Sequence, residues 1–179
     1  TGTVVYESGA TLEHAIAGIG HYPEGRSKSK GVELESVEAA VFDGTPLAFV
    51  ASERASVIGV YDVTDPAAPV LKQLLPSGVS PEGMVAIPQR NLLASANEVD
   101  LVEDGGVRAH VMIYERAEGP AAYPMITSAG SADLIGWGAL SGLAADPAEA
   151  GKLFAVSDSV YGAAPVIYSI DATQTPARI

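Results

Sequence analysis

The feature that most constrains the fold of this chain is a loose internal repeat of short apolar runs separated by turns. Each repeat contains an apolar run, a turn, a second run, a turn, a third run, a Pro-containing turn and a short tail. The three complete units begin at Val32, Ser80 and Gly138. The same place in the third run is held by Tyr61, Tyr114 and Tyr168. A regular recurrence of this kind predicts stacked copies of one small structural unit.

The apolar runs have the composition of β-strands. They are rich in Val, Ile, Ala, Phe and Tyr, as in VIGVYDV at 57–63 and VMIY at 111–114, and they end at Gly, Pro, Asp or Asn. Asp-Gly pairs at 43–44 and 104–105 supply turn signals. We also interpret the segment Thr11–Ala17 as a strand, although a helix could be read there.

Four short strands in about 45–60 residues, repeated, predict an all-β fold of the β-propeller type. A β-sandwich whose hairpins are similar by accident is the alternative. We expect one propeller portion over residues 1–179, made of a partial blade at 1–20, a loop at 21–31 and four-stranded antiparallel blades at about 32–79, 80–130 and 138–179. Because a propeller has four to eight blades, we expect a piece of a longer protein. Its open blade faces could also pair with a second copy.

Charge and composition exclude several classes of protein. Asp and Glu number 22 against 10 Lys and Arg, so the net charge is −12, which argues against nucleic acid as a partner. The chain has no Cys, which excludes disulfides and thiolate metal sites. It has no apolar run of about 18 residues, so we expect no membrane span.

Two families resemble parts of this sequence. The motifs ESV (35–37), AFVASE (48–53), VYDVTDP (60–66), SPEG (80–83) and ANE (96–98) resemble the choice-of-anchor I family of secreted or surface-attached bacterial propellers. The motifs LSGL (140–143), LFAVSD (153–158) and IYSID (167–171) resemble the phytase-like family, named for an esterase-like activity of phytase. The first resemblance implies a secreted, periplasmic or cell-surface protein, and the second implies an ester or phosphoester hydrolase. Neither supplies a catalytic motif that transfers residue by residue.

Acidic residues recur at equivalent ends of the expected strands. In a blade, the start of the first strand and the end of the second lie at the same face of the propeller. The expected first strands begin with Glu35, Glu82 and Ser141, and the second strands end with Glu53, Asn97, Glu98 and Asp158. Carboxylates so close together would repel one another unless a cation lies among them, and oxygen ligands suit Ca²⁺. We therefore predict a Ca²⁺ site formed by Glu82, Glu98 and Asp158 with help from Glu35, Glu53 and Asn97. Alternatively, these acids only cap turns.

The remaining polar and aromatic candidates are scattered. Arg26, Lys28 and Lys30 could hold an anionic substrate and His21 could act as a general base, or the segment that carries them is a solvated loop. We expect Arg54 to form an ion pair. For His14, His110, Trp137 and the three repeated tyrosines we expect packing within strands and blades.

Two functions remain open from the sequence. One is a Ca²⁺-dependent hydrolase of the phytase-like kind, in which the cation polarises an ester or phosphoester oxygen of a small anionic substrate. The other is a non-catalytic surface propeller that binds a protein or a ligand.

Overall fold

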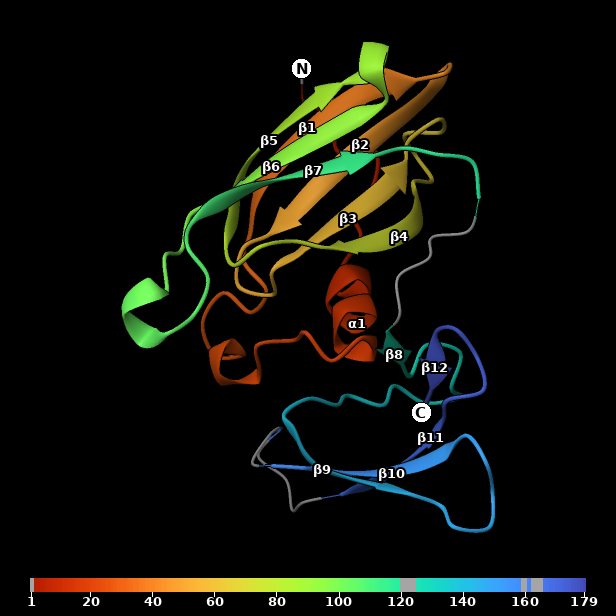
Figure 1. Cartoon of the computed structure of the whole chain (residues 1–179). Helices are drawn as coiled ribbons and strands as arrows, with labels where there is room; N and C mark the ends of the chain where they lie inside the picture. The colour runs from red at the N-terminus through yellow and green to blue at the C-terminus, as the bar shows by residue number, and fades with distance from the viewer. Residues whose placement is uncertain (1, 120–124, 159–160, 162–165) are drawn as a thin grey trace. The chain divides into compact units, whose positions relative to one another are not determined.

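β-Strands, nearly all paired antiparallel, are the main regular secondary structure of the computed structural model, which describes residues 2–119, 125–158, 161 and 166–179 (Figure 1). The chain divides into two units. The first comprises Thr1–Gly9 and Val32–Gly119, and the second comprises Ala10–Gly31 and Pro120–Ile179. The prediction of an all-β protein is thus confirmed at the level of fold class.

The first sheet contains the four strands expected between residues 32 and 79. Its strands are β1 (Leu34–Phe42), β2 (Thr45–Ser52), β3 (Val57–Asp62) and β4 (Val70–Pro76). They pair antiparallel in the order in which they occur in the chain. The β1–β2 hairpin turns at Asp43 and Gly44, whose φ values of 47° and 81° are both positive. This is the backbone that a two-residue hairpin with Asp-Gly favours.

The second sheet has three strands among the described residues. They are β5 (Pro81–Ile87), β6 (Leu92–Asn97) and β7 (His110–Glu115), again antiparallel and in sequence order. Short 3₁₀ turns lie at Pro88–Arg90 and Val102–Asp104. We expected a fourth strand in this sheet before residue 130, and that expectation is wrong for the described residues. The next strand, β8 (Ile126–Thr127), pairs instead with the last strand of the chain.

The first and second sheets share one hydrophobic core. Phe42, Phe49 and Ile58 of the first sheet are buried with Leu93 of the second. The rings of Phe42 and Phe49 meet edge to face, with centroids 5.8 Å apart. Met84, Ala86 and Tyr114 pack against this cluster from the second sheet. Two consecutive repeats therefore stack face to face.

The third sheet lies in the second unit. It consists of β9 (Leu140–Ala145), β10 (Lys152–Ser157), β11 (Ile167–Asp171) and β12 (Ala177–Arg178), which pair antiparallel, with β8 parallel to β12 at the edge. Ala155, Tyr168 and Ile170 are buried on one face, where Trp137 packs against them. The expected packing roles of Trp137 and Tyr168 are confirmed, and Tyr61 is buried in the first unit.

An α-helix, α1 (Thr11–Gly18), replaces the strand that we predicted over Thr11–Ala17. Leu12 and Ile16, one helical turn apart, are both buried and give the helix its apolar face. His14 consequently lies exposed on a helix rather than half-buried in a strand. The helix ends at two glycines, and Gly20 takes a positive φ of 75° that closes the last turn. Among the described residues, no helix is both long enough and apolar enough to cross a membrane.

The shared core of the first unit yields a stability prediction. Phe42 is 2% exposed, so Phe42→Ala should lower the free energy of unfolding by about 3–5 kcal/mol through lost burial and a residual cavity. Val37 in the same strand is 67% exposed, and Val37→Ala should cost less than about 1 kcal/mol. Urea unfolding followed by circular dichroism measures both values. Equal costs for the two variants would contradict the assignment of Phe42 to the core.

Candidate metal centre

A β-bulge occurs at the start of the first strand of each repeat. The pairing register shifts by one residue at Glu35 between β1 and β2, at Glu82 between β5 and β6, and at Ser141 between β9 and β10. A bulge leaves its extra residue outside the ladder and re-aims the side chain. The three residues that the sequence analysis aligned as equivalent therefore share one backbone defect.

A second backbone feature accompanies each bulge. The residue two positions earlier has a positive φ, which is uncommon for residues other than glycine: 53° at Glu33, 61° at Ser80 and 44° at Ala139. Its carbonyl accepts a hydrogen bond from the backbone N–H of the residue that follows the second strand. These donors are Glu53, Glu98 and Asp158, at 2.9, 3.0 and 2.9 Å. The three repeats thus have the same local geometry at this end.

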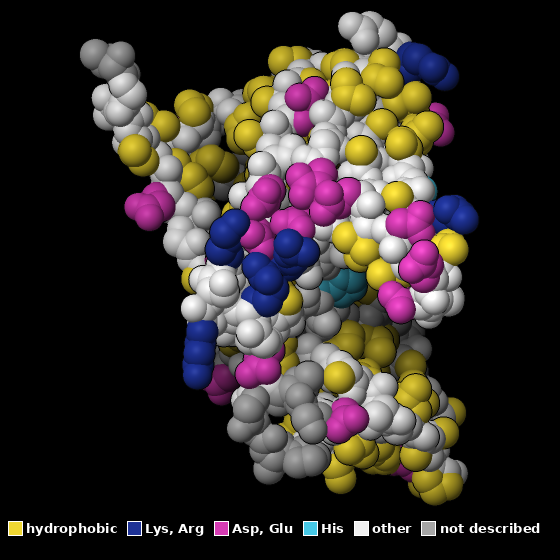
Figure 2. Space-filling model, turned by 90° about the vertical axis from the view of Figure 1, so that its left-hand side faces the viewer, with side chains coloured by type: hydrophobic (Ala, Val, Ile, Leu, Met, Phe, Trp, Pro, Cys, Tyr) yellow, Lys and Arg dark blue, Asp and Glu magenta, His cyan; other side chains and the backbone are white. Residues whose placement is uncertain are grey.

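In the first unit this geometry gathers five carboxylates, which we call the acidic cluster: Glu33, Glu35, Glu53, Glu82 and Glu98. The carboxylate oxygens of Glu33, Glu35 and Glu53 lie within 4.8 Å of one another, and so do those of Glu53, Glu82 and Glu98. Figure 2 shows Asp and Glu side chains gathered on one face of the molecule. The antiparallel pairing of β1 with β2 and of β5 with β6 explains why residues distant in sequence meet here.

Arg54 neutralises the buried part of the acidic cluster. Its Nη1 lies 2.9 Å from Glu53 Oε1, and its Nε donates to Glu33 Oε2 at 3.1 Å. Ser80 Oγ also donates to Glu53 Oε1, at 2.8 Å. The side chains of Glu53 and Glu33 are only 3% and 6% exposed, so they need these partners. The expected ion pair of Arg54 is confirmed, and the hydrogen bond with Glu33 raises the pKa of the Arg54 guanidinium.

The rest of the acidic cluster, Glu35, Glu82 and Glu98, is exposed to solvent. The pKa of Glu82 is raised, chiefly by desolvation and further by the negative charges of Glu98, Glu53 and Glu35, while Arg54 acts in the opposite direction. Arg54 pairs with two of the five carboxylates, those of Glu33 and Glu53. The proximity of the carboxylates and the all-oxygen donor set fit a hard divalent cation such as Ca²⁺.

Two of the predicted ligands are not members of the acidic cluster. Asn97 is buried, and its Nδ2 donates to the carbonyl of His110 at 3.0 Å and to that of Ser95 at 3.3 Å. Its amide is therefore engaged within its own sheet. Asp158 lies in the second unit, where its backbone repeats the geometry of Glu53 and Glu98. Its part in a cation site stays a prediction.

The segment that carries the predicted substrate-binding residues, which we call the basic segment, also lies in the second unit. Lys28, Lys30 and His21 are exposed and Arg26 is half-buried. The segment begins with a 3₁₀ turn at Glu24–Arg26, and the carbonyl of Arg26 accepts hydrogen bonds from Ser29 and Gly31. Their proposed contact with an anionic substrate stays a prediction.

Glu33 was missed by sequence reasoning. It precedes the expected first strand and has no acidic equivalent in the other repeats, where Ser80 and Ala139 take its place. Its role depends on a positive φ that turns the backbone next to Arg54. The sequence did contain one indication of this role, because Glu33 and Glu35 are separated by a single residue at the start of a strand.

Comparison with known proteins gives one partial match. The family model of the choice-of-anchor I domain matches residues 1–66. This range contains Glu33, Glu35, Glu53 and Arg54. No curated protein and no solved structure matches the chain. The resemblance to the choice-of-anchor I family is therefore supported for the first third of the chain, whereas the resemblance to the phytase-like family receives no support.

The raised pKa of Glu82 predicts a pH-dependent effect of Glu82→Gln. Because the pKa is higher in the folded chain than in the unfolded one, ionised Glu82 opposes folding, and this effect grows as the pH rises through the folded-state pKa. In buffer with a chelator, Glu82→Gln should therefore melt at a higher temperature than the parent at pH 7. The difference should close as the pH falls toward the ordinary value of 4.5.

Glu103→Gln, an exposed substitution with the same charge change, is the control and should show no such pH-dependent gain. A melting temperature of Glu82→Gln below that of the parent at pH 7 would show that Glu82 is not under repulsion.

Proposed function

We propose that this chain is part of a surface-associated, non-catalytic β-propeller whose acidic cluster binds Ca²⁺. The observation that carries the proposal is the convergence of Glu53, Glu82 and Glu98, with carboxylate oxygens within 4.8 Å of one another. These three residues come from the ends of strands in two different sheets. A cation among them would join the first and second repeats at one end.

The propeller architecture is supported by the repeated backbone motif and by the stacking of two consecutive sheets. The outer face of the second sheet exposes Val85, Val111 and Ile113, at 52%, 63% and 68%. In the register of this sheet these side chains share a face opposite to Met84 and Tyr114, which face the core. A blade stacked on this face would cover the exposed side chains.

The chemistry of the ligands favours Ca²⁺. Carboxylates without imidazole or thiolate partners suit a hard ion with a flexible coordination sphere. The ion would relieve the repulsion that adds to desolvation in raising the pKa of Glu82, while Arg54 would keep Glu33 and Glu53 Oε1 neutralised. Its role would be to tie the two sheets together and to fix the surface that faces a partner.

Surface association is supported by the match of residues 1–66 to the choice-of-anchor I domain. A hydrolase of the phytase-like kind is the second candidate, and it would also use the cation site. The binding module is favoured because the matched family is the choice-of-anchor one. The two functions differ in whether the Ca²⁺-loaded chain turns over a phosphoester.

Calorimetric titration of Ca²⁺ into the metal-stripped chain tests the cation site. We expect one site with a Kd of about 10⁻⁷ to 10⁻³ M, the range spanned by sensor and extracellular Ca²⁺ sites. Thermal melts should show stabilisation that grows with Ca²⁺ concentration, because only the folded chain presents the assembled ligands.

Without Ca²⁺, the Glu82→Gln variant should melt at a higher temperature than the parent. With Ca²⁺, the variant should lack the increase in melting temperature that the parent shows. Glu103→Gln should behave like the parent in both conditions. No binding heat and no thermal shift would contradict the cation site. Hydrolysis of p-nitrophenyl phosphate by the Ca²⁺-loaded parent, lost in Glu82→Gln, would establish the hydrolase instead of the module.

A further inference from the structure

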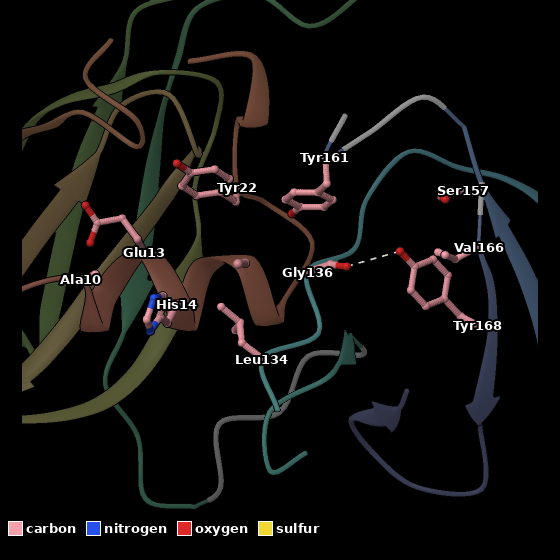
Figure 3. Close-up of a pocket in the computed structure, with 11 residues that line it drawn as sticks. Ala10, Glu13, His14, Tyr22, Leu134, Gly136, Ser157, Tyr161, Val166 and Tyr168 are labelled. Carbon is pink, nitrogen blue, oxygen red and sulfur yellow. Dashed lines mark hydrogen bonds between the residues drawn. The ribbon is translucent and has the colours of Figure 1, made fainter. Parts of the chain in front are cut away.

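A pocket of about 600 Å³ lies within the second unit, and its described lining includes no residue of the acidic cluster. Its described lining comes from three places: the helix α1 with Ala10 before it and Tyr22 after it, the segment that precedes β9, and four residues at or near β10 and β11, namely Ser157, Tyr161, Val166 and Tyr168. This volume falls within the range of about 300–1,000 Å³ that is usual for small-molecule sites. Figure 3 shows the residues that line it.

Hydrogen bonds fix the walls of this pocket. Trp137 Nε1 donates to the carbonyl of Gly18 at the end of α1, at 2.9 Å, and the backbone N–H of Ser128 donates to the same carbonyl at 2.8 Å. Ser128 Oγ donates to the carbonyl of Ile135 at 2.6 Å. The Trp137 ring also lies so close to Gly20 that a Cβ there would come within 2.7 Å of it. The helix and the segment before β9 are thereby held together around a preformed cavity.

Three tyrosines present rings rather than free hydroxyls to the pocket. Tyr161 donates to the carbonyl of Trp137 at 3.2 Å, and Tyr168 donates to the carbonyl of Gly136 at 3.3 Å. Tyr22 Oη lies 3.1 Å from Ser27 Oγ. The rings of Tyr22 and Tyr161 are nearly parallel, with centroids 6.5 Å apart. In the view of Figure 3 these two rings lie on one side, with His14 and Leu134 on the other.

The charge of the lining selects for a cation. Among the described lining residues there is one carboxylate, that of Glu13, and no Lys or Arg. The pKa of the Tyr161 hydroxyl is raised, chiefly by burial and further by Tyr168, Glu24 and Tyr22, so its ring presents a neutral phenol to the pocket. The faces of such aromatic rings attract quaternary ammonium groups.

We propose that this pocket binds a small organic cation of the quaternary ammonium class, with the rings of Tyr22 and Tyr161 as the aromatic surface and Glu13 as the counter-charge. The apolar remainder of the lining, including Leu134 and Val166, suits the alkyl groups of such a ligand. The residues of this proposed site all belong to the second unit, whereas the acidic cluster belongs to the first.

Choline is the probe, and its neutral isostere 3,3-dimethyl-1-butanol is the matched control ligand. Trp137 is the only Trp of the chain, so its fluorescence reports on this region without labelling, and calorimetry gives the affinity. We expect choline to bind at least about 10-fold more tightly than the isostere, since only choline carries the charge that the aromatic faces attract. Equal affinities, or no binding of choline, would overturn the proposal.

Paired variants separate the aromatic effect from folding. Tyr22→Leu should weaken choline binding by about 2- to 30-fold, whereas Tyr22→Phe keeps the ring and should bind as the parent does. Glu13→Gln should weaken choline binding without changing that of the isostere, while Glu103→Gln should change neither. Circular dichroism melts of each variant verify that it is folded. Unchanged affinity in a folded Tyr22→Leu variant would overturn the role of the ring.

Discussion

The pairing of the first and second strands in each repeat is the constraint on which the rest of the structure depends. Antiparallel pairing brings the start of one strand beside the end of the next, and the bulge at Glu35, Glu82 or Ser141 turns one side chain out of the ladder. A hydrogen bond to a residue with positive φ closes the same corner each time. Because this local geometry recurs in all three sheets, the bulge residue of each sheet takes an equivalent position at the end of its first strand.

The acidic cluster shows how this geometry is made compatible with stability. Two of its carboxylates are buried, and Arg54 with Ser80 supplies them with donors. The other three carboxylates, those of Glu35, Glu82 and Glu98, are exposed. The pKa of Glu82 is raised by desolvation and further by the negative charges of Glu98, Glu53 and Glu35. Ionisable groups whose pKa values are shifted by their surroundings are characteristic of sites that act on a ligand. The pocket of the second unit has a different chemistry, because its described lining combines aromatic rings with a single carboxylate.

Much of this arrangement could be predicted from the sequence. β-branched and aromatic runs identified the strands, Asp43-Gly44 identified a hairpin, and the repeat aligned Glu35 with Glu82 and Glu53 with Glu98. The helix α1 was missed because the repeat favoured a strand there, although Leu12 and Ile16 follow a helical period. The pairing of β8 with β12 and the role of Glu33 depend on tertiary contacts and on a backbone angle, which no local pattern records.

If strand ends from two sheets assemble one cation site, the anomalous diffraction of Ca²⁺ in crystals of the chain will show it, because this signal locates the ion without relying on activity. We expect a single peak in the first unit, with oxygens of both Glu82 and Glu98 at about 2.3–2.6 Å from it. A Ca²⁺-soaked crystal in which no ion lies at these carboxylates would overturn the cation site.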